Sequence, residues 1–285
     1  MNRWAVPILL KGRHFTRQTP GPLDYRPAAD KHDFMENAVG IWSQTDLAGH
    51  ICRVYEPPSP SPYNYVVIYL HCSEAASLKG YPAFGREFDR YGLRVIEPVS
   101  GRSWWTDRIW PEFDAAISAE AYVLQHVLSY VAEHWNAKPP RLALLGISMG
   151  GQAVLRLAYK YPTVFPTVAA IAPAIDFQKR IEEGVDPGLE FMYRNAEEAR
   201  QDTALLHIHP LNWPRNQFFC CDPTDIRWHD SADRLRMKLS SLGVPFECDL
   251  EAEAGGHSFQ YACHMAPRAI GFIAERLEQE RRRVV

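Results

Sequence analysis

One glycine-rich turn between an apolar strand and a helix constrains this chain more than any other stretch. The strand is expected over residues 141–146 and the helix over 149–161, and the turn between them reads Gly146-Ile147-Ser148-Met149-Gly150-Gly151. A turn this sharp strains the backbone of its serine and requires glycines on both sides to avoid clashes. The G-x-S-x-G pattern in this context lifts a serine hydroxyl above a sheet. Ser148 is therefore a candidate nucleophile, and the alternative is an ordinary glycine-rich turn.

Apolar runs and amphipathic stretches alternate along most of the chain. The run at 65–70 is β-branched and aromatic throughout, which is typical of a strand buried on both faces. A stripe of apolar residues at helical spacing predicts a long helix over 113–136. Further strands are expected at 93–97, 164–175, 217–221 and 246–251, a hairpin at 39–44 and 50–55, and a terminal helix at 265–280. This order predicts an α/β fold with a mostly parallel central sheet and helices on both faces.

Composition excludes several classes of protein. The 285 residues are 46% hydrophobic and 23% charged, the balance of a globular protein with a sizeable core. The 31 Lys and Arg against 34 Asp and Glu give a formal net charge of −3, so the basic excess typical of nucleic-acid binding is missing. No apolar run approaches the roughly 18 residues of a membrane helix. We expect neither a nucleic-acid partner nor a membrane partner.

The expected domain organisation is an N-terminal extension over 1–38 and one domain over 39–285. The extension is irregular, and its apolar stretch at 4–10 is interrupted by Pro7 and lacks a signal-peptide cleavage site. The six cysteines form no CxxC pair and are too few in a chain of this length for a disulfide framework. These features predict a protein of the reducing cytoplasm.

A serine hydroxyl needs a histidine to take its proton and a carboxylate to hold that histidine. His257 follows the last predicted strand in Gly255-Gly256-His257, at the sheet edge where Ser148 also lies. The histidines at 126, 134, 207 and 209 are expected to have structural roles. Asp225, in the loop after the strand at 217–221, is the first candidate for the acid, since the order Ser…acid…His is preserved. Asp222 and Asp176 are the alternatives, and Asp222 could instead brace its own loop.

An oxyanion hole needs two preorganised N–H donors. Met149, the residue after the serine, supplies one of them. The second is expected from Cys72 or Ser73, in the loop after the strand at 65–70. His71 reads as a residue that braces this loop rather than a second base, and Cys72 is a minor alternative nucleophile.

Together these segments resemble an α/β-hydrolase, and within that superfamily the chain is similar to the esterase D and S-formylglutathione hydrolase-like esterases. The resemblance covers roughly residues 40–280 and rests on His71, the turn around Ser148, the run Ala169-Ala170-Ile171-Ala172-Pro173-Ala174, the Asp225 loop and Gly256-His257. It implies hydrolysis of small carboxylic esters or thioesters through an acyl-serine intermediate, without metal or cofactor. The family usually has His-Gly where this chain has His71-Cys72.

The substrate pocket and several alternatives remain open at the level of sequence. Trp104 and Trp105 follow the strand at 93–97 and could line an acyl pocket or pack beneath the loop. Residues 177–214 form a short insertion that reads equally well as a lid or as a connecting segment. The rival functions are a peptidase or amidase of the same fold and a non-catalytic binding protein of the hydrolase fold. A homodimer is also left open.

Overall fold

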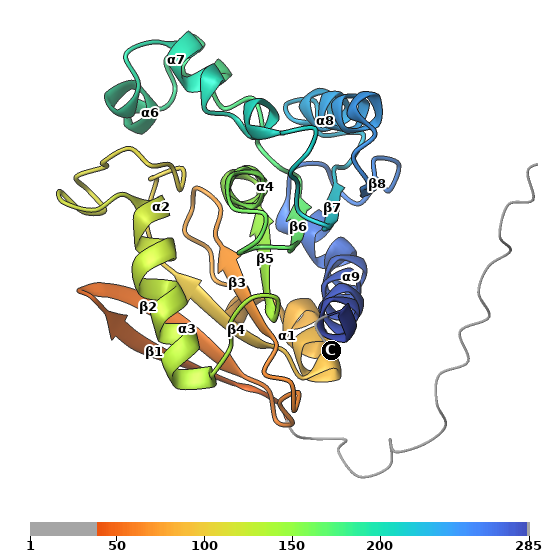
Figure 1. Ribbon diagram of the computed structural model, residues 1–285. Helices are drawn as coiled ribbons and strands as arrows, with labels where there is room; N and C mark the ends of the chain where they lie inside the picture. Colours follow the sequence, from red (N-terminus) through yellow and green to blue (C-terminus); the bar gives the residue numbers. More distant parts are fainter. Residues whose placement is uncertain (1–38, 284–285) are drawn as a thin grey trace, which may run out of the picture. The chain divides into compact units, whose positions relative to one another are not determined.

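A mostly parallel sheet of eight strands organises residues 39–283, the part of the chain that the computed structural model describes (Figure 1). The extension expected over 1–38 lies outside the described residues. The strand order is β1-β2-β4-β3-β5-β6-β7-β8; the β1–β2 and β2–β4 pairs are antiparallel and every other pair is parallel. The strands are β1 (Ile41–Leu47), β2 (His50–Glu56), β3 (Val66–Leu70), β4 (Arg94–Pro98), β5 (Leu142–Ile147), β6 (Thr167–Ile171), β7 (Asn216–Cys220) and β8 (Glu247–Asp249). The predicted fold class is confirmed.

Helices cover both faces of this sheet. On one face lie α1 (Pro82–Tyr91) and α9 (Phe259–Arg283), and on the other lie α2 (Ala119–Tyr122), α3 (Leu128–Trp135), α4 (Met149–Lys160) and α8 (His229–Leu242). Strand β3 shows why both layers form: Val66, Ile68 and Leu70 enter one core, whereas Val67 and Tyr69 enter the other. Side chains of a strand point alternately to opposite faces, so a run of five apolar residues serves two cores at once.

The helix expected over 113–136 begins six residues later than the apolar stripe suggests. Asp114 accepts hydrogen bonds from the backbone N–H groups of Ala116 and Ile117 at 2.7 and 3.1 Å, which holds this part in a turn. The Ser118 hydroxyl oxygen then caps α2 by accepting from the N–H of Ala121 at 3.2 Å. A π-helical turn, η3 (Val123–Val127), joins α2 to α3. The hydrogen bonds of Asp114 to the backbone therefore keep the segment before Ser118 out of the helix, although its apolar residues have helical spacing.

Two other boundaries also differ from the sequence prediction. The strand predicted over 164–175 is reduced to β6, because Ala172 takes a left-handed conformation with φ 46° directly after Ile171 and Pro173 follows. The terminal helix begins at Phe259 instead of 265, and Pro267 lies inside it. The Ser258 hydroxyl oxygen accepts from the N–H of Tyr261 at 3.2 Å and marks that earlier start.

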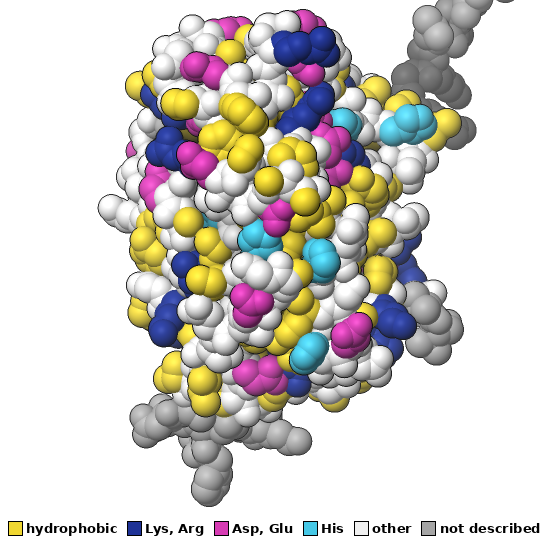
Figure 2. All heavy atoms as spheres, turned by 90° about the vertical axis from the view of Figure 1, so that its left-hand side faces the viewer, with side chains coloured by type: hydrophobic (Ala, Val, Ile, Leu, Met, Phe, Trp, Pro, Cys, Tyr) yellow, Lys and Arg dark blue, Asp and Glu magenta, His cyan; other side chains and the backbone are white. Residues whose placement is uncertain are grey.

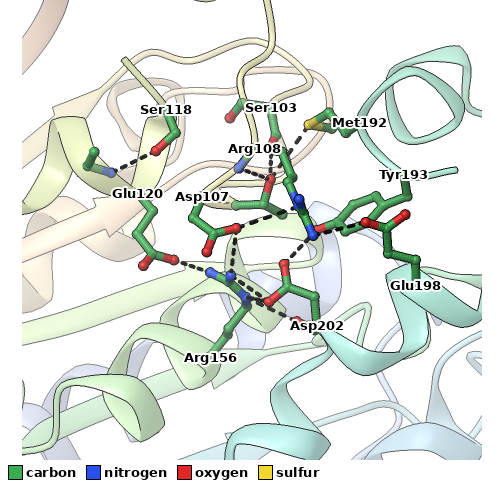
Figure 3. A network of polar contacts seen from close by, with 12 residues as sticks. Ser103, Asp107, Arg108, Ser118, Glu120, Arg156, Met192, Tyr193, Glu198 and Asp202 are labelled. Carbon is green, nitrogen blue, oxygen red and sulfur yellow. Dashed lines mark hydrogen bonds and ion pairs between the residues drawn. The ribbon is translucent and has the colours of Figure 1, made fainter. Parts of the chain in front are cut away.

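The insertion expected over 177–214 is largely helical. It contains α5 (Lys179–Glu182), α6 (Pro187–Met192), α7 (Ala196–Gln201) and the 3₁₀ turn η4 (Ala204–His207), and α6 and α7 lie at the top of Figure 1. A buried arginine of α4 connects it to the rest of the domain: Arg156 pairs with Asp202 just after α7, with Glu120 of α2 and with Asp107 (Figure 3). The helix that follows Ser148 is thus tied to the insertion.

Surface charge of both signs is interspersed with hydrophobic side chains on the face that Figure 2 presents, with no large area of one sign. None of the described helices combines the length and the apolarity needed to cross a bilayer. The six cysteines are all free thiols.

Candidate active site

The turn between β5 and α4 holds Ser148 in strained backbone, with φ 56° and ψ −115°. Glycine is required at 146 and at 150, because a Cβ atom on Gly146 would collide with the backbone of Gly150 and one on Gly150 with the carbonyl of Leu70. The Ser148 N–H donates to the Ile171 carbonyl at 3.0 Å, which fixes the turn to β6. The packing of β3 and β6 around this turn therefore sets the position of the serine hydroxyl.

A hydrogen-bond chain runs from this hydroxyl through a histidine to a buried carboxylate. Ser148 Oγ lies 2.8 Å from His257 Nε2, and His257 Nδ1 lies 2.7 Å from Asp225 Oδ2. An ionised carboxylate only accepts hydrogen bonds, so Nδ1 carries the proton and Nε2 is free to accept the proton of the serine. The three side chains come from loops after β5, β7 and β8, all at the carboxyl edge of the parallel strands.

Asp225 is held in its charged form although it is only 3% exposed. Burial alone would raise its pKa, but the hydrogen bond and charge of His257, together with the backbone N–H groups of Trp228 and Arg227, lower the pKa below its ordinary value. Those two N–H groups donate to Oδ1 at 3.1 and 3.2 Å, which leaves Oδ2 directed at the histidine. The arrangement keeps a negative charge on the far side of the imidazole.

The two alternative acids serve other purposes. Asp222 joins two loops: Oδ1 accepts from the N–H and the hydroxyl of Thr224 at 2.8 and 2.6 Å, and Oδ2 accepts from the N–H groups of Ala254 and Gly256 at 2.7 and 2.9 Å. These bonds overcome its burial and lower the pKa of Asp222 to about 2. Asp176 forms ion pairs with Lys179 and Arg234. Neither carboxylate is hydrogen-bonded to His257, and Asp222 holds the loop that carries it.

The loop after β3 lies beside the serine and is braced by His71. The Ser100 N–H donates to His71 Nε2 at 3.0 Å, so the ring proton is on Nδ1, which donates to the Cys72 carbonyl at 2.7 Å. Burial lowers the pKa of His71 to about 4, which keeps the ring neutral and this pattern intact at neutral pH. Cys72 and Ser73 line the same cavity as Ser148 and Met149. Burial raises the pKa of Cys72 to about 11, so its thiol is a poor nucleophile.

A cavity of about 810 Å³ surrounds the serine and the histidine. Trp104 lines it, whereas Trp105 is absent from the lining: it is fully buried and its Nε1–H donates to the His71 carbonyl at 3.2 Å. Of the two roles left open by the sequence, Trp105 therefore takes the second and packs beneath the loop after β3, whereas Trp104 lines the pocket. The φ values of Trp104 and Trp105 are 53° and 56°, so both residues adopt left-handed backbone.

Sequence reasoning missed the charged residues of this lining, which include Glu74, Arg102, Arg180 and Arg227. Arg102 follows β4 and Arg227 lies two residues after Asp225, both in loops at the carboxyl edge of the sheet. That placement was the available signal, since side chains at this edge converge on the crevice where ligands of open α/β sheets bind. Within residues 39–283, no group of three or more His, Cys, Asp or Glu side chains is arranged to hold a metal ion.

Comparison with known proteins agrees with this architecture. The family model described as "Putative esterase" matches residues 52–241, which is most of the chain. An S-formylglutathione hydrolase from Agrobacterium tumefaciens superposes with a TM-score of 0.66 at 18% identity, covering 84% of this chain and 94% of its own. The fluorophosphonate-binding serine hydrolase FphF from Staphylococcus aureus gives 0.66 at 16% identity, covering 84% and 98%.

A more limited similarity links the chain to the diacylglycerol acyltransferase/mycolyltransferase Ag85C of Mycobacterium leprae. The two are 32% identical over 96 residues, which is 32% of this chain and 28% of that protein, so little more than a quarter of that relative is matched. At their low identities the structural neighbours show the α/β-hydrolase fold alone. The family match shows more: the chain belongs to this esterase family.

Proposed function

We propose that this protein is a serine hydrolase that cleaves small carboxylic esters or thioesters through an acyl-serine intermediate. The observation that carries the proposal is the hydrogen-bond chain Ser148–His257–Asp225, with bonds of 2.8 and 2.7 Å, at a strained turn inside a cavity. This is the arrangement that activates a serine, because each group orients the next. Membership of the esterase family supports ester hydrolysis as the chemistry.

In the first half of the reaction, Ser148 Oγ attacks the acyl carbonyl and His257 Nε2 takes the hydroxyl proton. The positive charge that forms on the ring is stabilised by Asp225, which keeps Nδ1–H in place. The carbonyl oxygen becomes an oxyanion, for which we propose the N–H of Met149, at the start of α4, and the N–H of Cys72 or Ser73 as donors. His257 then returns the proton to the departing alcohol or thiol.

In the second half, water replaces the leaving group beside His257. The histidine takes a proton from that water, the hydroxide attacks the acyl-serine carbonyl, and the same oxyanion donors act again. The carboxylic acid leaves when the proton returns from Nε2 to Ser148 Oγ. No residue outside this set is needed to balance the protons of the cycle.

Labelling with a fluorophosphonate probe tests the nucleophile directly. We expect the wild-type protein to be labelled and Ser148→Ala to remain unlabelled, with His257→Ala labelled far more slowly. With p-nitrophenyl esters of increasing acyl length, Ser148→Ala or His257→Ala should reduce turnover by about 10⁴-fold or more, because the three residues act as a unit. A folded Ser148→Ala protein with near-normal esterase activity would end this mechanism.

The same experiment separates the two rival functions. A peptidase or amidase would also label, but it would cleave aminoacyl amides and leave the esters intact. A non-catalytic binding protein would not be labelled and would not hydrolyse the esters, while circular dichroism would show that it is folded. The braced Asp225 and the strained Ser148 support the hydrolase over the binding protein, because a strained, oriented nucleophile has no use in binding alone.

A further inference from the structure

The cavity at Ser148 offers more room than a small acyl group requires. Its volume of about 810 Å³ is in the range of pockets that enclose a complete drug-sized ligand. Part of the lining is apolar, with Trp104, Trp228 and Phe259 among its side chains. A substrate that fills this cavity therefore extends beyond the reacting carbonyl and contacts groups that have no part in the bond cleavage.

Three arginines from three separate segments line this cavity. Arg102 comes from the loop after β4, Arg180 from α5 in the insertion, and Arg227 from the loop after β7. Arg180 is fixed by Asp186, which is 1% exposed and whose Oδ2 accepts from Arg180 Nε at 3.2 Å and from Trp104 Nε1 at 3.1 Å. The guanidinium of Arg180 is thus anchored beside an aromatic wall of the cavity.

Arg102 and Arg227, by contrast, have no acidic partner among residues 39–283. Nearly all arginines among residues 39–283 lie within 4.0 Å of a carboxylate; the four that do not are Arg86, Arg102, Arg141 and Arg227. Two of these four line the one cavity that contains the serine. In a chain that pairs its arginines this thoroughly, unpaired guanidinium groups at the reaction site are available for an external anion.

The glutamates that share a cavity lining with these arginines are not their partners. Glu74 lines the cavity, but its Oε1 accepts from the Ser73 hydroxyl at 2.9 Å; burial opposes its charge, yet hydrogen bonds from Cys72 and Ser73 lower its pKa. A side cavity of about 240 Å³ shares Arg180 and Arg227 with the main one and adds Lys179 and Glu183. Lys179 is paired with Asp176 at 3.4 Å. Neither Glu74 nor Glu183 lies within 4.0 Å of Arg102 or Arg227.

We propose that Arg102 and Arg227, with Arg180 beside them, bind an anionic oxygen group that the substrate carries away from the scissile bond. The preferred substrate would be an ester or thioester with a carboxylate or a phosphoryl group in its acyl or its alcohol part. Guanidinium groups match both anions through paired N–H donors. This inference rests on the proposed function for its assignment of the cavity as the substrate site.

The test compares esters that differ only at their far end. On the acyl side these are the p-nitrophenyl esters of hexanoate, of adipate as its half ester and of 5-phosphonopentanoate, which share four methylenes. On the alcohol side they are the acetates of 4-hydroxybenzamide and 4-hydroxybenzoate. Binding is measured by calorimetry on Ser148→Ala protein, which does not turn the esters over, and kcat/KM is measured on the wild type.

We expect at least one charged ester to bind about tenfold more tightly than its neutral partner, equivalent to one charge-assisted contact of about 1.4 kcal/mol. The adipate and phosphonate arms tell which anion is preferred, and the two series tell which side of the substrate carries it. Arg102→Gln and Arg227→Gln should each reduce the charged-to-neutral ratio, and the double variant should bring it close to one. Arg227→Lys should restore part of it. Arg86→Gln, the same change on an unpaired arginine outside this lining, should leave the ratio intact.

A ratio close to one in the parent protein, or a ratio that survives the double variant, would overturn the proposal. Because the dissociation constants come from the Ser148→Ala protein, they decide the question even if the wild type hydrolyses none of the esters. If the wild type hydrolyses none of the esters but the charged esters still bind more tightly, the proposed function fails and the cavity remains an anion-binding site.

Discussion

Glu97, at the end of β4, is a fully buried carboxylate that the proposed reaction does not use. Its Oε1 accepts from the N–H of Leu78 at 3.0 Å and its Oε2 from the Ser77 hydroxyl at 2.6 Å, while Arg53 lies 3.8 Å away. The effect of burial on the pKa of Glu97 exceeds that of these contacts and raises it from 4.5 to about 7. Glu97 therefore holds the segment that follows the loop after β3, and its charge state changes near neutral pH.

A raised carboxyl pKa makes stability fall as the pH rises. Between about pH 4.5 and 7 the unfolded chain has released this proton while the folded chain still binds it, so the contribution of Glu97 is full below that window and lost above it. Glu97→Gln removes the linkage, and at pH 8 we expect the variant to be more stable than the wild type by on the order of 1–3 kcal/mol. Urea unfolding at pH 5 and pH 8 measures this. The exposed Glu112→Gln is the control, and identical pH profiles for Glu97→Gln and wild type would contradict the prediction.

At the scale of elements, the sequence predicts what depends on neighbours along the chain. The buried run of β3 and the turn between β5 and α4 are where expected, because an apolar period and a pair of glycines are local signals. The late start of α2 and the early start of α9 were missed, since each depends on a side chain that bonds a particular backbone group. The pairing of Arg156 with Asp202 was also out of reach, because the two are 46 residues apart and meet only in the folded chain.

Among the contacts between elements, we expect the loss of those of Arg156 to lower the stability of the protein most. Its side chain is fully buried and pairs with Glu120 and, at 2.6 Å, with Asp202 (Figure 3). Burial opposes the charge of Asp202, but the hydrogen bond from His207 and the charge of Arg156 lower its pKa to about 2. Arg156→Met removes the cation that Glu120 and Asp202 share and, among residues 39–283, leaves them only Lys160 and His207 as ion-pair partners. We expect a loss of about 3 kcal/mol or more in the free energy of unfolding. Equilibrium unfolding in urea measures the loss.

The matched control also removes the negative charges of the two carboxylates that pair with Arg156. Adding Glu120→Gln and Asp202→Asn to Arg156→Met should recover part of the stability, because neutral amides cost less to bury than carboxylates that have lost their arginine. We also expect KM for the p-nitrophenyl esters to rise in Arg156→Met, since the insertion that carries Arg180 loses its ion pair with α4. We propose on this basis that residues 177–214 act as a fixed wall of the cavity. An unchanged KM in a measurably destabilised variant would argue against that wall.

For the molecule as a whole, the geometry of the sheet explains why the candidate site could be predicted in part. Ser148, Asp225 and His257 follow β5, β7 and β8, and parallel strands end at one edge, so chain order and strand order together bring them near each other. The cavity lining was harder, because Arg102 and Arg180 belong to a loop and an insertion whose paths the sequence does not reveal. The choice between the two roles of Trp105 stayed open for the same reason, and in the structure Trp105 has left-handed backbone and packs under the loop after β3.

The boundary at residue 38 gives a prediction for the whole molecule. The compact unit that begins at this boundary includes, within residues 39–283, the eight strands of the sheet, both packed cores and the Ser148–His257–Asp225 hydrogen-bond chain. A unit with its own core can fold alone. We therefore expect a protein that begins at Ala38 to unfold in urea with the same midpoint as the full chain and to keep its kcat/KM for p-nitrophenyl esters.

A second truncation shows that the assay can detect a boundary placed wrongly. A protein that begins at Ala48 lacks β1, which pairs with β2 along its seven residues and packs Trp42 against Tyr55 at a ring distance of 4.8 Å. Removing that strand uncovers the edge of β2 and the apolar surface beneath Trp42, so we expect a loss of at least ~2 kcal/mol in stability. If the protein that begins at Ala38 behaves like this shorter one, or folds but loses activity, the first 37 residues belong to the working enzyme and the domain does not begin at residue 39.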